Sequence, residues 1–186
     1  NKIGRYAPSW KKDDQGRELF PFGEGAEQFI KALGNCCKAH SAVLVIRSHL
    51  NAQIGQSTLD NVVYCAQKDY PDTEGLLLDT DVLICDWSSI AFDFLALNRP
   101  TLFLDVAPPF RHGFSLGPEY RFGRVVADME SLSKALTACL QQPEEGVPEI
   151  KARHAKITAD VYGDNTDGEA ARRQLARVAR ISGKNN

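Results

Sequence analysis

The sequence lacks the features that define several large classes of protein. It has no excess of charge: 22 basic residues stand against 24 acidic ones, for a formal net charge of -2. Nothing therefore demands a nucleic acid or an anionic membrane as a partner. No apolar stretch approaches the roughly 20 residues that span a bilayer, and no signal peptide is recognised. The first residue is Asn and a strand is expected almost at once, so we expect an excised piece of a longer protein.

Cofactor and metal motifs are also missing. The five cysteines are odd in number and none lies in C-x-x-C spacing, which favours a reducing cytosol over disulfides or a zinc site. Neither G-x-G-x-x-G nor G-x-x-x-x-G-K occurs, so an NAD site and a P-loop are unsupported. A Ser-His-Asp hydrolase would lack its nucleophile elbow. Asp79, Asp81 and Asp86 fall on both sides of a strand, which argues against a shared ion. We expect no cofactor and no metal.

Short apolar runs alternate with segments of helical period, and 43% of the 186 residues are hydrophobic, enough for one domain over residues 1–186. The expected strands are 3–7, 42–46, 61–65, 82–85, 101–104 and 124–126. The expected helices are 26–39, 73–78, 89–97 and 131–141, followed by two terminal helices, 148–161 and 167–181, within about 148–182. Buried strands separated by helices, without hairpin signals, predict an α/β fold with a parallel sheet covered on both faces.

Polar residues cluster where three of these strands end. The clusters are Ser9-Trp10-Lys11-Lys12, Arg47-Ser48-His49 and Asp86-Trp87-Ser88-Ser89. Ligands of such folds bind beyond the carboxyl ends of the strands. The third cluster also opens a helix, whose free N–H groups and dipole favour an anion. The sequence therefore predicts an anion site at this edge of the sheet.

Each candidate residue also has a plain structural interpretation. Ser88 and Ser89 are good helix caps, so these residues alone do not decide between capping and phosphate binding. Asp86 suits a second cap or an acceptor for a ribose hydroxyl, and Asp93 suits the helix dipole better than a ligand.

Two further candidates lie at the ends of the first two expected strands. His49 lies two residues from Arg47 at a strand end, and the pair favours anion recognition or proton chemistry. Trp10 suits either a core anchor or a wall of the ligand site.

Four segments resemble the CDP-glycerol glycerophosphotransferase family, the polymerases and primases of teichoic acids and related capsular polymers. They are Tyr6-Ala7-Pro8-Ser9-Trp10, Val45-Ile46-Arg47-Ser48-His49, Asp81 to Pro100, and Asp167-Gly168 with Arg172 or Arg173. The third block is the most specific. The resemblance spans nearly the whole chain.

The resemblance implies a Rossmann-like half of a two-domain GT-B transferase that binds the donor nucleotide, CDP-glycerol or a related CDP-polyol. Ser88 and Ser89 would hold the donor phosphates, with Ser9, Trp10, Arg47, Asp86 and Asp93 around the substrate. His49 would contact or protonate the departing diphosphate. The acceptor, a polyol-phosphate or lipid-linked polymer, would meet a histidine from the other half, so this piece alone should not turn over. We expect it in the cytoplasm, at the inner face of the cell membrane.

The chain departs from the family pattern in places that affect its substrate. Trp87 replaces a usual Tyr, and Leu50 replaces a frequent Pro. The stretch after residue 104 offers Asp105, Arg111-His112-Gly113 and Tyr120-Arg121 in place of the usual run, which leaves the polyol open between glycerol, ribitol and other units. Two alternatives remain: a GT-B glycosyltransferase using a UDP- or CMP-sugar, and a non-catalytic nucleotide-binding module.

Overall fold

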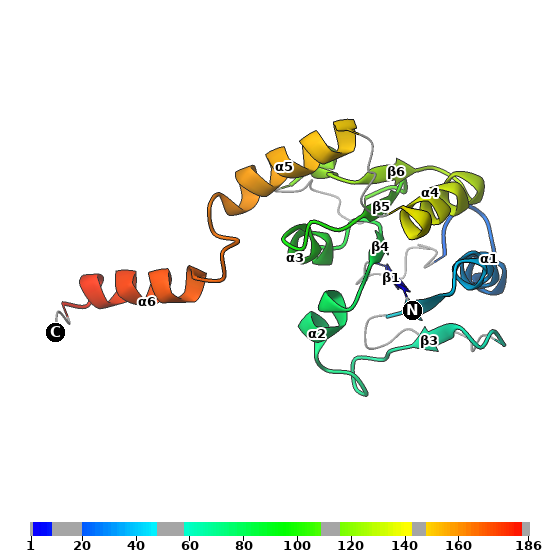
Figure 1. The fold of residues 1–186 in the computed structure, drawn as a ribbon, viewed down its shortest axis with the longest axis horizontal. Helices are drawn as coiled ribbons and strands as arrows, with labels where there is room; N and C mark the ends of the chain where they lie inside the picture. Colours follow the sequence, from blue (N-terminus) through cyan, green and yellow to red (C-terminus); the bar gives the residue numbers. More distant parts are fainter. Residues whose placement is uncertain (1, 9–19, 48–57, 109–115, 143–147, 184–186) are drawn as a thin grey trace.

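The computed structural model describes residues 2–8, 20–47, 58–108, 116–142 and 148–183 (Figure 1). Its centre is a six-stranded sheet in the order β3-β2-β1-β4-β5-β6, with every neighbouring pair parallel. The strands are β1 (Lys2–Ala7), β2 (Ala42–Ile46), β3 (Val62–Tyr64), β4 (Val82–Cys85), β5 (Thr101–Leu104) and β6 (Arg124–Val126). The parallel sheet predicted from the sequence is confirmed.

Helices cover both faces of this sheet, as predicted. They are α1 (Ala26–Ala39), α2 (Thr73–Leu78), α3 (Ile90–Leu95), α4 (Met129–Gln141), α5 (Pro148–Tyr162) and α6 (Ala170–Ile181), with a short 3-10 turn at Pro118–Tyr120. Residues of α1 and α4 pack on one face, and residues of α2, α3 and α5 pack on the other. No helix of the described ranges is long and apolar enough to cross a bilayer.

The two faces of the sheet carry separate apolar cores. On the α1 and α4 face, the rings of Tyr6, Phe20 and Phe29 meet with centroids 5.2–5.9 Å apart. On the other face, Phe103 packs edge-on against Phe122 with centroids 5.2 Å apart. Strands buried on both sides carry mostly apolar side chains, which is why the polar clusters follow the strands at the sheet edge.

Some helix limits differ from the predicted ones because of capping. Helix α4 begins two residues before the predicted Ser131, because Asp128 is its N-cap. The Asp128 carboxylate accepts a hydrogen bond from the Ser131 N–H (2.6 Å), and the Ser131 hydroxyl accepts one from the Asp128 N–H. Helix α3 ends at Leu95 rather than Leu97, before Asn98 takes a positive φ of 51°.

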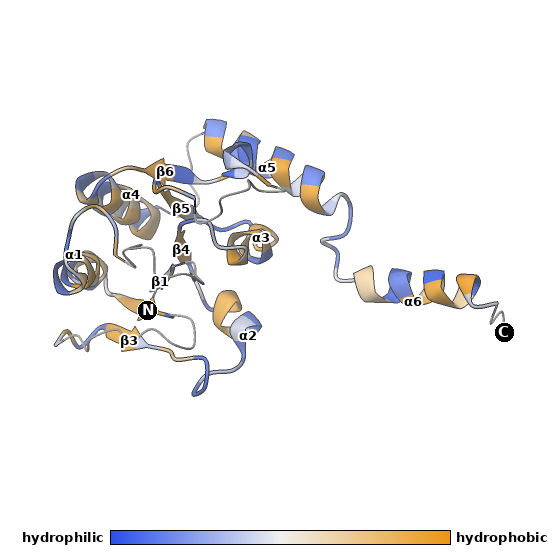
Figure 2. Ribbon diagram, turned by 180° about the vertical axis from the view of Figure 1, so that it is seen from behind, coloured by the Kyte–Doolittle hydropathy of each residue, from blue (hydrophilic) through white to orange (hydrophobic). Residues whose placement is uncertain are grey.

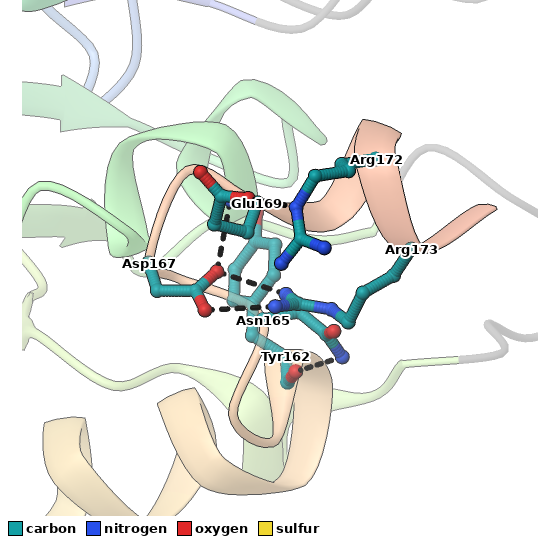
Figure 3. A network of polar contacts seen from close by, with 6 residues as sticks. All are labelled: Tyr162, Asn165, Asp167, Glu169, Arg172 and Arg173. Carbon is teal, nitrogen blue, oxygen red and sulfur yellow. Dashed lines mark hydrogen bonds and ion pairs between the residues drawn. The ribbon is translucent and has the colours of Figure 1, made fainter. Parts of the chain in front are cut away.

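Helix α6 projects away from the sheet, and none of its residues is buried (Figures 1 and 2). Its start is built by a polar network in the preceding turn (Figure 3). Arg173 donates to both carboxylate oxygens of Asp167 (2.7 and 2.8 Å), and Arg172 pairs with Glu169. Gly168 follows Asp167 with a φ of +80°. The turn therefore delays the helix to Ala170, three residues after the predicted start.

Candidate functional site

The ends of β2, β1 and β4 lie side by side, which brings the first residues of the three predicted clusters to one edge. Ala7 pairs with Cys85, and Tyr6 pairs with Ile46. The backbone N–H of Arg47 donates to the Tyr6 carbonyl (3.1 Å). The β1–β2 connection runs through α1 on one face, whereas the connections on either side of β4 run through α2 and α3 on the other. The edge between β1 and β4 is therefore the topological switch point, where such sheets bind ligands.

Several predicted site residues lie outside the described residues. These are Ser9, Trp10, Lys11, Lys12, Ser48, His49 and, in the long loop, Arg111 and His112. The catalytic role of His49 and the binding roles of Ser9 and Trp10 therefore stay predictions.

The turn after β4 is described in full. Asp86 is buried, and its carboxylate accepts a hydrogen bond from the Trp87 N–H (2.6 Å). Ser88 is half-buried and Ser89 is exposed. The turn therefore presents two hydroxyl residues at the switch point, with an acid held beneath them.

The capping interpretation of this turn does not hold for Ser89. Ser89 is the N-cap residue of α3, but its side chain makes no capping hydrogen bond. Its backbone is already helical (φ -60°, ψ -20°), whereas a capping side chain needs an extended residue to reach the N–H groups ahead of it. The N–H groups of Ala91 and Phe92 are instead bonded to the carbonyls of Ser88 and Ser89. Fewer helix amides thus remain for an anion, and the hydroxyl of Ser89 has no capping role.

Arg47 is buried at the end of β2, and its side chain is hydrogen-bonded to the segment that leads into α2. Its guanidinium donates to the Tyr70 carbonyl (2.7 Å) and to the Thr73 hydroxyl (2.8 Å). Thr73 is the first residue of α2. The contacts of Arg47 are therefore structural, and its predicted contact with substrate stays a prediction.

Asp93 lies in the first turn of α3 and is exposed. Partial desolvation, together with the charge of Glu74, raises the pKa of its carboxyl. Its charge in turn helps to raise the pKa of Tyr162 on α5, whose hydroxyl donates to the Phe92 carbonyl (2.7 Å). Asp93 thus faces other anionic or phenolic groups. Its predicted role as a substrate contact stays a prediction.

Sequence reasoning missed the contact that joins the turn after β4 to the loop after β5. The guanidinium of Arg121 lies over the ring of Trp87, 3.9 Å from its centroid. Arg121 also donates to the Leu104 carbonyl and to Asp105 (both 3.2 Å), and Trp87 donates to the Val106 carbonyl (2.8 Å). Arg121 belongs to the stretch whose sequence leaves the polyol open, and in the structure it braces the turn that carries Ser88 and Ser89.

A second missed residue is Arg5, in the middle of the central strand. Its side chain is 1% exposed, and its Nε and Nη1 atoms have no hydrogen-bond partner. Burial, followed by the charge of Arg47, lowers the pKa of Arg5 to about 10. The signal was present in the sequence, because an arginine inside a strand expected to be covered on both faces needs a reason.

The described residues contain no group of three or more side chains placed to hold a metal ion. Asp81 is used instead to bond the backbone N–H of Ile3 (2.7 Å), at the start of β1. All five cysteines are free thiols.

A doubly wound parallel sheet with polar turns at its switch point defines the class: a Rossmann-like α/β domain. The chain belongs to the CDP-Glycerol:Poly(glycerophosphate) glycerophosphotransferase family, whose model matches residues 1–180. The family resemblance seen in the sequence is thereby confirmed.

Individual relatives agree with this assignment. The chain is 29% identical over 182 residues to a teichoic acid glycerol-phosphate transferase of Staphylococcus aureus, covering 92% of this chain and 43% of the relative. It is 22% identical over 182 residues to the teichoic acid ribitol-phosphate polymerase TarK of the same organism, covering 95% of this chain and 34% of the relative. The chain thus spans less than half the length of these relatives.

Among solved structures, the wall teichoic acid polymerase TagF superposes with a TM-score of 0.65 at 24% identity. The match covers 98% of this chain and 44% of TagF. At that identity the likeness shows the fold alone. It confirms the α/β fold predicted from the sequence.

Proposed function

We propose that this chain is the donor-nucleotide-binding part of a CDP-polyol-dependent polyol-phosphate transferase that extends a teichoic-acid or capsular polymer. The observation that carries the proposal is the position of Asp86-Trp87-Ser88-Ser89, the most specific block of the family resemblance, at the switch point of the sheet. A nucleoside diphosphate placed there would lie across the ends of β1 and β4. Relatives named for both glycerol-phosphate and ribitol-phosphate transfer leave the polyol open.

The proposed reaction is phosphoryl transfer. An acceptor hydroxyl attacks the phosphorus that carries the polyol, a new P–O bond forms, and the P–O bond to CMP breaks. Negative charge grows on the transferred group and on the departing phosphate, so hydroxyls, backbone N–H groups and a cationic side chain are the groups that lower the barrier. In our proposal Ser88 and Ser89 hold the diphosphate and His49 stabilises or protonates the leaving group. The base for the acceptor would come from outside this chain.

Where the reaction takes place is part of the proposal. A CDP-activated donor is a cytoplasmic metabolite class, and five unpaired thiols suit a reducing compartment. We infer that the transferase works in the cytoplasm beside the membrane that carries its growing polymer.

Calorimetric titration of the 186-residue chain with CDP-glycerol, CDP-ribitol, CMP and UDP tests the proposal. We expect the cytidine diphosphates to bind more tightly than UDP, and the preference between the two polyols to name the carried group. Tighter binding of UDP would favour a sugar-nucleotide enzyme. Indifference to every cytidine nucleotide would refute the proposal.

The double variant Ser88→Ala/Ser89→Ala tests the site itself. We expect weaker CDP binding with little change in melting temperature, because Ser89 makes no capping bond. Ser131→Ala is the matched control. Its hydroxyl closes the cap of α4, so it should lower the free energy of unfolding by about 1 kcal/mol and leave CDP binding unchanged. A double variant that binds CDP like the parent chain would remove the serines from the site.

A further inference from the structure

Arg5 is a charged side chain in the least accessible part of the molecule. It lies in the middle of β1, between β2 and β4, and is 1% exposed. Its Nε and Nη1 atoms are buried without a hydrogen-bond partner. Buried polar groups in native proteins are nearly always paired, so each exception calls for an explanation.

Among the described residues, no acidic side chain acts on the charge of Arg5. Burial and the positive charge of Arg47 both disfavour the charged form of Arg5, and together they lower its pKa to about 10. Of the groups in the described ranges, the thiols of Cys65 and Cys85 also act on its charge. Burial raises the pKa of both thiols, so they are neutral at physiological pH, while Arg5 stays protonated.

This arrangement lowers the stability of the ligand-free protein. A buried charge without a partner is strongly unfavourable, and apolar residues of similar volume often replace buried ion pairs without loss. Proteins tolerate such a cost where function needs it. A bound anionic ligand would supply the missing counter-charge for Arg5.

The position of the Arg5 side chain indicates where such a ligand would bind. Side chains alternate along a strand, so Arg5 lies on the same face of β1 as Ala7, where α2 and α3 pack. The groups that act on its charge, Arg47, Cys65 and Cys85, all lie at or just beyond the carboxyl ends of their strands. The guanidinium therefore lies under the sheet edge that carries Asp86 to Ser89.

We propose that Arg5 is an internal counter-charge for the phosphate groups of the ligand that binds at the switch point between β1 and β4. The proposal rests on the proposed function for the identity of that ligand, a nucleoside diphosphate. Arg5 acts there through its charge and its unpartnered N–H groups. It is a binding residue that the four family-like segments do not contain, since they begin at Tyr6.

The test compares Arg5→Met with the parent chain, using CDP, CMP and inorganic pyrophosphate as probes in calorimetry. Arg177→Met on α6 is the matched control, because it removes the same charge from an exposed site. We expect Arg5→Met to melt at the same temperature or higher without ligand, and to lose at least about tenfold in affinity for CDP and pyrophosphate. Arg177→Met should bind both probes like the parent chain.

The outcomes separate this inference from the proposed function. If CDP binds the parent chain and Arg5→Met equally, Arg5 is not a phosphate residue and the proposed function stands. If the parent chain binds no cytidine nucleotide, the proposed function fails, and the pyrophosphate comparison alone decides for or against Arg5. Should Arg5→Met fail to fold, the Nε–H resonance of Arg5 in the parent chain gives the answer. It must shift on addition of pyrophosphate, and an unchanged resonance overturns the inference.

Discussion

Removing the guanidinium of Arg121 should loosen the turn that carries Ser88 and Ser89. In Arg121→Met the aliphatic stem stays, while the cation over Trp87 and two hydrogen bonds are lost. The affected residues come from the β4–α3 turn and from the loop between β5 and β6, which otherwise belong to separate strand connections.

The magnitude follows from the individual contacts. A desolvated cation over a tryptophan contributes about 1–2 kcal/mol. The bond to Leu104 contributes about 1 kcal/mol, since that carbonyl keeps the Val106 N–H as a second donor. The pair with Asp105 adds about 0–1 kcal/mol, because the Asp105 side chain is 58% exposed. The total is about 2–4 kcal/mol, or a fall of roughly 4–16 °C in melting temperature for a chain of this size.

A double-mutant cycle in urea isolates the contact between the two side chains. Trp87→Leu removes the ring, and Arg121→Met in that background has no ring left to contact. We expect a coupling of about 0.5–2 kcal/mol from the cation over the ring. Additive effects, within about 0.5 kcal/mol, would refute the argument that Arg121 braces the turn through Trp87.

Two further predictions concern the frame around the site. Gly123→Ala should destabilise the fold by about 1–3 kcal/mol or more in a thermal melt, because the new Cβ would lie 2.0 Å from the backbone oxygen of Thr101. Gly117→Ala is its control and should cost little, since it meets only the flexible end of Glu119; equal costs would contradict the steric argument. Hydrogen bonds from Arg173 hold the pKa of Asp167 well below its usual range. The contribution of Asp167 is therefore present above its unfolded pKa of about 3.9 and is lost as pH falls below it. Amide protection factors in α6, which correct for the intrinsic pH dependence of exchange, should fall over that range, and Asp167→Asn should abolish this fall; protection that does not change with pH would rule out this pair as the clamp.

The sequence predicted elements well where apolar periodicity decides them. The limits of α1, β2, α2, β4, β5 and β6 match the predicted ranges. The misses lie where a side chain selects among local options. Capping was one of two interpretations of Ser89, but its backbone is already helical and its side chain makes no capping bond. Asp128 moved the start of α4, and the turn at Asp167 moved the start of α6.

The site was harder to predict because its key contacts are not local. The sheet edge that carries the site could be predicted, because parallel strands end at the same edge and polar residues follow three of them in the sequence. The stacking of Arg121 on Trp87 joins residues 34 positions apart (121 − 87) and has no periodic signature. The missing partner of Arg5 is a property of the packed sheet, since composition shows an arginine but not what surrounds it.

The central place of β1 has a consequence for how the sheet assembles. Both of its partners come later in the chain, β2 at residues 42–46 and β4 at residues 82–85. During synthesis β1 therefore waits for its second neighbour until the chain has grown past β4, with one edge unpaired. Sheets with such non-local pairing fold slowly and are prone to aggregate before they close. Without β1 in place, the pair β3-β2 and the group β4-β5-β6 are not joined. Conditions that favour rapid chain collapse should therefore trap this protein with the sheet open between β2 and β4.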